Sequence, residues 1–407
     1  MTLAEFPAVL TLVGLAAYAV LGGADFGAGF WQLLGGRGGR DKALREHAHH
    51  AMGPVWEANH VWLIFVLVVC WTAYPTAFGS IASTLAVPLF IAGIGIILRG
   101  TAYAMRSGAG SAREQRRIEL VFACSSILTP FALGALIGGI ASGRVPVGNA
   151  KGDLLTSWLN PTSLVLGVIA VATAAYLAAV YLAADAVRID RPDLELAFRT
   201  RALVMAVIAG AAALAGLAVV HSDADRIWEG LTSSPGLFAV IVSAVAGAAT
   251  VAFVVRRRYG PARVTAATAV AAIVAGWGLA QRPQFLPGLT IEQAAASRSV
   301  LVATIVSLTL GALILVPSLG LLYSLLLRGH FDEEPARRRE TRVPAVGPRR
   351  QLPLLPAAGL CLVVGVAATV PFDSAWGRII GVPFLVAFVA LGFLSLATAM
   401  TASAESD

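Results

Sequence analysis

The stretch Gly22-Gly23-Ala24-Asp25-Phe26-Gly27-Ala28-Gly29-Phe30-Trp31 places a carboxylate inside an apolar run that extends over residues 6–34. A helix needs about 20 apolar residues to span the hydrocarbon core of a bilayer, so this run is long enough to cross it. A carboxylate at such depth costs at least ~2.5 kcal/mol on insertion scales and therefore indicates a functional site. A second carboxylate, Glu57, and an arginine, Arg99, follow in the next two apolar segments.

The composition is that of an integral membrane protein. Of the 407 residues, 57% are hydrophobic and only 13% are charged, with a mean hydropathy of +0.78. Soluble domains carry about 25% charged residues. Eleven segments are long and apolar enough to span a membrane, which predicts an all-α polytopic fold. They cover residues 6–34, 55–73, 79–104, 118–142, 162–185, 200–220, 236–255, 262–280, 299–327, 352–371 and 379–401.

The positive charges predict the orientation of these segments. Lys and Arg are concentrated in the loops after the first, third, fifth, seventh and ninth segments, as at Arg113, Arg116 and Arg117. By the positive-inside rule the N-terminus lies outside and the C-terminus lies in the cytoplasm. The net charge of +7 is therefore a topology signal, which excludes a nucleic-acid-binding function. No basic region precedes the first apolar run, so we expect a retained helix and not a cleaved signal peptide.

One polar run interrupts the hydrophobic chain near its end. Residues 331–350 are rich in Arg and Pro and predict a basic cytoplasmic linker. The linker separates a nine-helix membrane domain, residues 1–330, from an extra pair of transmembrane helices and a short tail, residues 351–407.

Asp25, Glu57 and Arg99 are expected to meet at similar depth. From a rise of 1.5 Å per residue, Asp25 lies ~15 Å and the other two lie ~10 Å from the predicted cytoplasmic face. The stretch around His47, His49 and His50 is expected to form the loop that precedes the second segment on this face. A carboxylate pair beside a guanidinium can share protons while the arginine offsets the charge, as a proton route from the cytoplasm requires. The alternative is a structural ion pair that locks three helices together.

Two polar residues follow Glu57 on the same predicted helix. Asn59 and His60 could extend a hydrogen-bonded relay from Glu57, since residues three apart share a helix face. The alternative for His60 is an ordinary interhelical hydrogen bond. A haem-ligand role would need a second axial group, but the other histidines lie in loops or at helix ends. We therefore expect this chain to bind neither haem nor metal with its own residues.

These motifs together resemble subunit II of cytochrome bd-type quinol oxidases. The specific matches are Asp25-Phe26-Gly27-Ala28-Gly29, the stretch from Pro54 to Leu63 that contains Trp56-Glu57-Ala58-Asn59-His60-Val61-Trp62, and Arg99. Further matches are Leu159-Asn160-Pro161, Tyr181-Leu182, Arg199-Thr200-Arg201 and residues 283–294, in the family's order over about residues 5–330.

The resemblance implies two four-helix bundles with a peripheral helix, in a bacterial cell membrane. It implies a partner, subunit I, that holds b-type and d-type haems, in a complex that oxidises quinol and reduces oxygen to water. The family also allows a structural quinone and a small accessory subunit. Asp25, Glu57 and Arg99 occupy positions associated with proton supply. Trp62, with Trp56 beside it, is expected either to line an oxygen route or to pack.

The chain departs from the family's usual pattern at several positions. Gly22-Gly23-Ala24-Asp25 replaces Asp-Gly-Phe-Asp, Glu57 stands where Asp is usual, and His60 stands where Gln or Glu is usual, so the proton route is expected to be retuned. Asp185 stands where a basic residue is common, which argues against a structural quinone.

Two other functions compete with the oxidase as explanations of the buried charges. A proton-coupled secondary transporter also contains buried acids and arginines, but its site lies near the midplane, whereas these charges lie near one face. A purely structural scaffold leaves Asp25 and Glu57 unexplained.

Overall fold

Most of the chain forms helices that are long enough to cross a membrane. The computed structural model describes residues 2–34, 39–50, 56–105, 111–327 and 354–369, together with residues 381, 383–384, 386–388 and 391. The chain divides into two compact units, Met1–Phe331 and Asp332–Asp407. In the described part, eight helices are long and apolar enough to span a bilayer. The predicted all-α polytopic membrane fold is thus confirmed.

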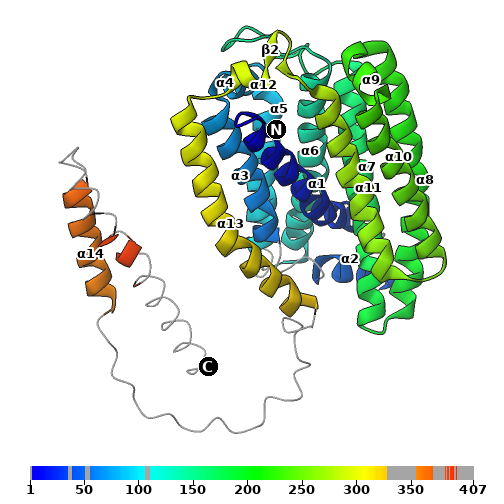
Figure 1. Ribbon diagram of the computed structural model, residues 1–407. Helices are drawn as coiled ribbons and strands as arrows, with labels where there is room; N and C mark the ends of the chain where they lie inside the picture. The colour runs from blue at the N-terminus through cyan, green and yellow to red at the C-terminus, as the bar shows by residue number, and fades with distance from the viewer. Residues whose placement is uncertain are drawn as a thin grey trace. The chain divides into compact units, whose positions relative to one another are not determined.

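The first unit contains two groups of helices and one helix at its edge (Figure 1). The first group consists of α1 (Glu5–Leu34), α3 (Trp56–Ala73), α5 (Ala86–Met105) and α6 (Ala112–Ala141). The second group consists of α7 (Pro161–Arg188), α8 (Pro192–Asp223), α10 (Ser234–Val255) and α11 (Tyr259–Gln281). At the edge, α13 (Arg298–Leu327) packs against α3 and α1. This arrangement agrees with the one that the family resemblance implies.

Helix α7 joins the two groups, because it packs against α1 and α6 as well as α8 and α11. It begins at Pro161, whose fixed φ suits a first helical position, and the Asn160 side chain accepts a hydrogen bond from the Ser163 N–H at 2.9 Å. Its middle is a run of buried alanines that lets neighbouring backbones approach. The closest approach is at Gly27 of α1, where an added Cβ would lie 1.9 Å from the Ala174 carbonyl oxygen.

The predicted segment 79–104 is two helices and not one. Helix α4 (Pro75–Thr84) ends at Thr84 with Leu85 as its C-cap, and α5 begins at Ala86. Pro88 explains the break, because it has no N–H for the Thr84 carbonyl four residues earlier and its ring clashes with that carbonyl.

The prediction of a loop around His47 is also wrong, because this stretch forms a helix, α2 (Gly39–His50). Leu44 and Ala48, four residues apart, are buried in the main core cluster together with residues of α5, α7 and α8. His47 Nε2 lies 3.0 Å from the Leu182 carbonyl oxygen of α7. The polar composition of α2 hid this short amphipathic pattern.

The other end of the helix groups carries the remaining short elements. These are α9 (Asp225–Thr232), the antiparallel strands β1 (Gln284–Leu286) and β2 (Leu289–Thr290), and α12 (Ile291–Ala294). Asp223 at the end of α8 accepts two hydrogen bonds from Arg144, at 2.6 and 3.0 Å. It also accepts one from the Thr162 hydroxyl at 2.6 Å. Asp223 thus ties the end of α8 to the α6–α7 connection and to the start of α7.

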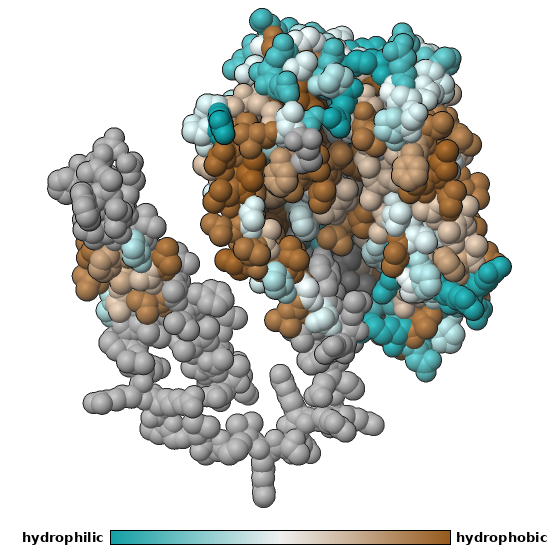
Figure 2. Space-filling view, in the orientation of Figure 1, coloured by the Kyte–Doolittle hydropathy of each residue, from teal (hydrophilic) through white to brown (hydrophobic). Residues whose placement is uncertain are grey.

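Apolar side chains form a belt across the middle of the first unit, between polar ends (Figure 2). Helix α13 contributes strongly, because Leu313, Ile314 and Val316 are each more than 60% exposed. In the second unit, α14 (Leu354–Thr369) corresponds to the predicted segment 352–371. The linker 331–350 and most of the predicted segment 379–401 lie outside the described residues.

Candidate functional site

The candidate site lies where α1, α5 and α6 approach closely. Glycines make the approach possible, because an added Cβ at Gly29 of α1 would lie 2.2 Å from the Ser126 hydroxyl oxygen of α6. A Cβ at Gly95 of α5 would lie 2.2 Å from the Thr129 hydroxyl oxygen of α6. A larger residue at either position would separate the helices. The glycines therefore bring Asp25 of α1, Arg99 of α5 and Ser126 of α6 into one buried cluster.

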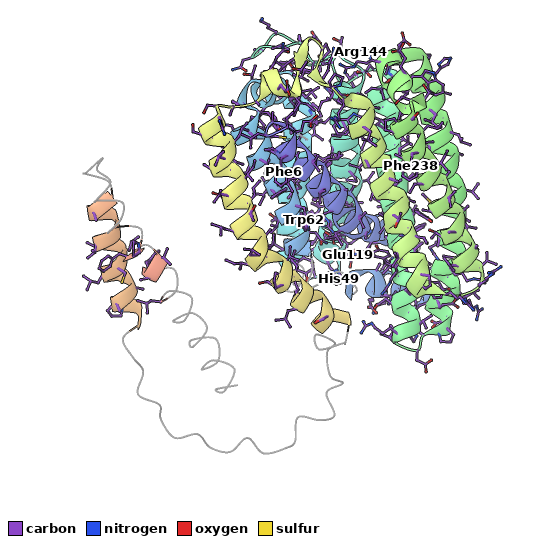
Figure 3. The ribbon with its side chains drawn as sticks, in the orientation of Figure 1. Phe6, His49, Trp62, Glu119, Arg144 and Phe238 are labelled. Carbon is purple, nitrogen blue, oxygen red and sulfur yellow. The ribbon has the colours of Figure 1, made fainter. Side chains whose placement is uncertain are left out.

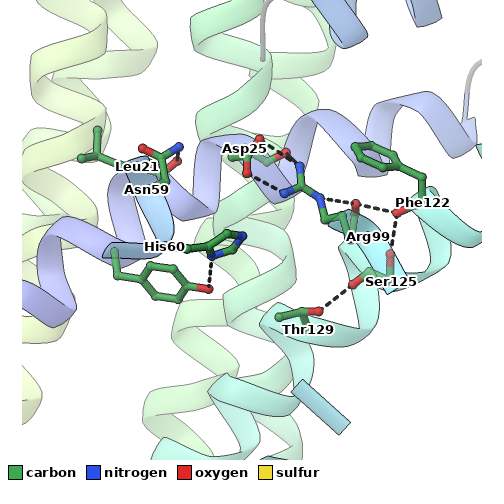
Figure 4. A network of polar contacts seen from close by, with 10 residues as sticks. Leu21, Asp25, Asn59, His60, Arg99, Phe122, Ser125 and Thr129 are labelled. Atoms are coloured by element: carbon green, nitrogen blue, oxygen red, sulfur yellow. Dashed lines mark hydrogen bonds and ion pairs between the residues drawn. The ribbon is translucent and has the colours of Figure 1, made fainter. Parts of the chain in front are cut away.

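Asp25 and Arg99 form a two-pronged ion pair inside this cluster (Figure 4). Arg99 Nη1 donates to Asp25 Oδ2 at 2.6 Å, and Nη2 donates to Oδ1 at 2.8 Å. Nη2 also donates to the Asp25 carbonyl oxygen at 3.1 Å. The arginine and aspartate side chains are only 2% and 3% exposed. Paired hydrogen bonds of this geometry are the strong, orientation-specific kind.

The rest of the guanidinium is also satisfied by side chains. Arg99 Nε donates to the Ser126 hydroxyl at 3.1 Å, and that hydroxyl donates to the Phe122 carbonyl oxygen at 2.7 Å. The Phe26 and Phe122 ring centroids each lie 4.8 Å from the guanidinium carbon. Aromatic faces attract a cation, more strongly where water is excluded. The Arg99 charge is thus held by one carboxylate, one hydroxyl and two rings.

Helix α3 brings two further polar side chains to α1. Asn59 Nδ2 donates to the Leu21 carbonyl oxygen at 3.2 Å. His60 Nδ1 lies 3.4 Å from the Tyr18 hydroxyl. The Phe26 ring is near both His60 and Arg99, since its centroid lies 5.8 Å from that of the imidazole and 4.8 Å from the guanidinium carbon. The site therefore has two polar branches that share one phenylalanine as a neighbour.

The structure brings together four of the residues that the sequence singles out. Asp25 and Arg99 are in direct contact, and Asn59 and His60 lie against the same helix as Asp25. Glu57 and Trp56 belong to α3, but their side chains lie outside the described part of the chain. Trp62 packs edge-on against Phe65 of its own helix, with ring centroids 6.2 Å apart, and is labelled in Figure 3.

Four residues of the site are not predicted from the sequence, namely Tyr18, Phe26, Phe122 and Ser126. Hydroxyls and aromatic rings are common in membrane helices, so none of them stands out as a buried charge does. Only spacing could have found Tyr18, which precedes Asp25 by seven residues and so lies on the same helix face.

Chemically, the first branch holds a carboxylate, a guanidinium and a hydroxyl in continuous hydrogen-bond contact, and the second holds a phenol and an imidazole. The carboxylate, the phenol and the imidazole can each bind or release a proton, whereas the guanidinium stays protonated and supplies a fixed positive charge. Among the described residues, no three His, Cys, Asp or Glu side chains gather into a group that could hold a metal ion.

Comparisons with known protein families, curated sequences and solved structures all point to the same family. A model of the family described as cytochrome bd terminal oxidase subunit II matches residues 3–326. Two curated proteins of Bacillus subtilis (strain 168) are similar in sequence. One, provisionally named a cytochrome bd menaquinol oxidase subunit II, is 24% identical over 222 residues, which are 53% of this chain and 61% of that protein. The other, a cytochrome bd ubiquinol oxidase subunit 2, is 27% identical over 129 residues, or 31% and 37% of the two chains.

The match therefore spans less than two thirds of the length of these curated relatives. A chain of the bd oxidase from Geobacillus thermodenitrificans has a similar fold, with a TM-score of 0.64 and 24% identity. The alignment covers 82% of this chain and 100% of that one.

Proposed function

The chain belongs to the cytochrome bd terminal oxidase subunit II family, and from this premise we propose that it is subunit II of a membrane oxidase that oxidises quinol and reduces oxygen to water. In this proposal its partner is subunit I, which carries the b-type and d-type haems. The complex lies in a bacterial cell membrane, with the N-terminus outside and the C-terminus in the cytoplasm. Membership in this family favours the oxidase over a proton-coupled transporter.

Within the complex, we assign this chain a share in the supply of protons from the cytoplasm. The observation that carries the assignment is the buried Asp25–Arg99 pair with its hydrogen bond to Ser126. Charged groups inside membrane helices are rare and costly, and they mark ion pathways and proton relays. Glu57, Asn59 and His60 belong to the proposed route, and Trp56 and Trp62 to a proposed oxygen route or to helix packing. The family also allows a structural quinone and a small accessory subunit.

The competing explanation is that the pair only holds helices together. Removing one partner of a buried pair costs ~3–5 kcal/mol, because the other charge is left uncompensated, so a single replacement would disturb assembly under either explanation. The paired replacement Asp25→Asn with Arg99→Gln removes both charges and keeps polar groups of similar shape. It therefore separates proton supply from structural support.

We expect the paired variant to retain haem content in the purified complex and to lose most of its oxygen consumption per haem. Replacing Glu57 by Gln is expected to act in the same way, since Gln keeps the hydrogen bonding but cannot exchange a proton. The control is Asp153→Asn, which changes an exposed carboxylate in the α6–α7 connection. Normal oxygen consumption per haem in the paired variant would show that the pair is structural, and the proton-supply assignment would be dropped.

A further inference from the structure

A basic turn joins α10 to α11 and has no part in the proposed proton route. It consists of Arg256, Arg257 and Arg258, which are all exposed. Arg257 Nε lies 3.7 Å from a carboxylate oxygen of Glu195, which also accepts a hydrogen bond from the Tyr259 hydroxyl. Within the described part of the chain, no hydrogen bond or ion pair engages the side chains of Arg256 and Arg258. The turn therefore carries more positive charge than its surroundings neutralise.

The ends of the helices do not account for these arginines. The carbonyl groups at the end of α10 attract cations, but Arg199 already donates to the Val254 and Val255 oxygens, at 3.1 and 2.8 Å. Arg257 has a φ of 57°, in the left-handed region where a helix usually ends on glycine. A turn that served only to reverse the chain would favour glycine at this position. The arginines therefore indicate a surface that binds negative charge.

An apolar stripe on α10 leads to this turn. Phe238, Val245 and Val255 of α10 are 68%, 63% and 50% exposed. At 3.6 residues per turn, Arg256 lies on the same helix face as Phe238 and Val245. Val245 is ~17 Å from Arg256 along the helix axis, which is about half the ~30 Å thickness of the hydrocarbon core. Figure 2 shows hydrophilic side chains at this end of the second group, beside the apolar belt.

We propose that the basic turn and the adjoining stripe of α10 bind an anionic phospholipid, with its phosphate at Arg256 and Arg258 and an acyl chain along the stripe. Guanidinium groups bind phosphate oxygens through paired hydrogen bonds. The stripe between Val245 and the turn has the depth of one leaflet, as an acyl chain requires. Helix α11 begins in the same turn without a side-chain cap, so the positive end of its dipole adds to the attraction. The proposal is independent of the oxidase function.

A phosphatidylglycerol with a photoreactive diazirine in its acyl chain tests the proposal on the full chain as isolated from the membrane in detergent. Mass spectrometry of the labelled peptides measures how much label reaches residues 238–255. The competitors are unlabelled phosphatidylglycerol and phosphatidylcholine of the same chain length, because these lipids differ in net charge and not in apolar length. We expect label on α10 and displacement at a lower concentration of phosphatidylglycerol than of phosphatidylcholine.

The paired change Arg256→Gln with Arg258→Gln should reduce this preference for phosphatidylglycerol roughly 25-fold, which is roughly fivefold for each arginine. The change of both residues to Lys should keep most of the preference, since the charge remains. The matched control is Arg113→Gln with Arg116→Gln, which removes two exposed arginines from the start of α6 and should leave the preference on α10 unchanged.

Equal displacement by the two lipids would overturn the proposal, because α10 would then offer only an apolar surface. Displacement by inorganic phosphate as effective as that by phosphatidylglycerol would also overturn it and would identify a site for free anions. An equal loss of preference in the control pair would assign the effect to overall charge and not to this turn. The comparison of lipids on the wild-type chain decides the matter even where a variant does not accumulate.

Discussion

The Arg99 guanidinium donates to three oxygens of Asp25 and to the Ser126 hydroxyl. A buried guanidinium loses its hydration, so each N–H that has a protein acceptor reduces the cost of burial. The Nε–H depends on Ser126 alone among the described contacts. The contribution of the Arg99 Nε–Ser126 hydrogen bond can therefore be measured by removing the Ser126 hydroxyl oxygen.

Replacing Ser126 by Ala should lower the stability of the complex by about 1–3 kcal/mol, because the buried Nε–H of Arg99 loses its acceptor. The thermal unfolding midpoint of the purified complex measures the effect. Ser125→Ala is the matched control, since Ser125 is equally buried and its hydroxyl donates only within α6, to the Phe122 carbonyl oxygen. Equal midpoints for the two variants would mean that Arg99 does not need Ser126.

At this scale, the sequence predicts the charges of the site but not its neutral partners. Asp25 and Arg99 stand out because a charge in an apolar segment is rare and costly. Ser126, Phe26 and Tyr18 do not, because their side chains are compatible with any membrane helix. Their role follows from which helix faces meet, and this is a tertiary property.

At the scale of helices, the contact between α1 and α7 sets how close the two groups can come. At Gly27 an added Cβ would lie 1.9 Å from a backbone oxygen of α7, and backbone cannot move aside as a flexible side chain can. At Gly23, one turn earlier, the nearest atom would be a Leu177 methyl carbon at 3.5 Å, an ordinary contact distance.

The change Gly27→Ala should therefore push α1 away from α7 and deplete the assembled complex from the membrane. Overpacking of this kind lowers stability by about 1–3 kcal/mol or more. Gly23→Ala should be tolerated, since the added methyl group would make only an ordinary contact with Leu177 and alanine favours a helix by up to ~1 kcal/mol. Haem content per milligram of membrane protein is the measurement. Similar haem content in both variants would contradict the close approach at Gly27.

The sequence predicts a helix correctly where the length of an apolar run determines it. The prediction fails where one or two particular residues determine where a helix begins or ends. Most of the described apolar runs appear as helices within a few residues of their predicted ends, because burial in a bilayer requires satisfied backbone hydrogen bonds, but α6 and α8 begin six and eight residues earlier than predicted. The break before α5 depends on Pro88, and α2 depends on two buried apolar residues, Leu44 and Ala48, in a polar stretch. Neither feature changes the average hydropathy enough to be seen.

At the scale of the whole molecule, the chain is longer than the family requires. The family match ends at residue 326, and the first compact unit ends at Phe331. The second unit, Asp332–Asp407, has no counterpart in that match.

A chain that stops after Phe331 should therefore assemble with its haem-bearing partner and consume oxygen at close to the full rate per haem. A chain that stops before α13, after Ser297, is the control and should not assemble, because it lacks a helix within the family match. Optical spectra of the membranes report haem content in both cases. Loss of haem in the longer chain would assign the second unit a role in assembly.

The pairing of Asp25 with Arg99 also determines how the site responds to voltage. A pair of opposite charges carries no net charge, so the membrane potential, ~2.3 kcal/mol per elementary charge per 100 mV, exerts almost no net force on it. A proton on Asp25 leaves Arg99 as a full positive charge in the same field. With the predicted orientation, a potential that is negative inside stabilises that charge in proportion to its electrical distance from the outer surface. Proton occupancy of the site then depends on the energisation of the membrane, although the resting pair does not.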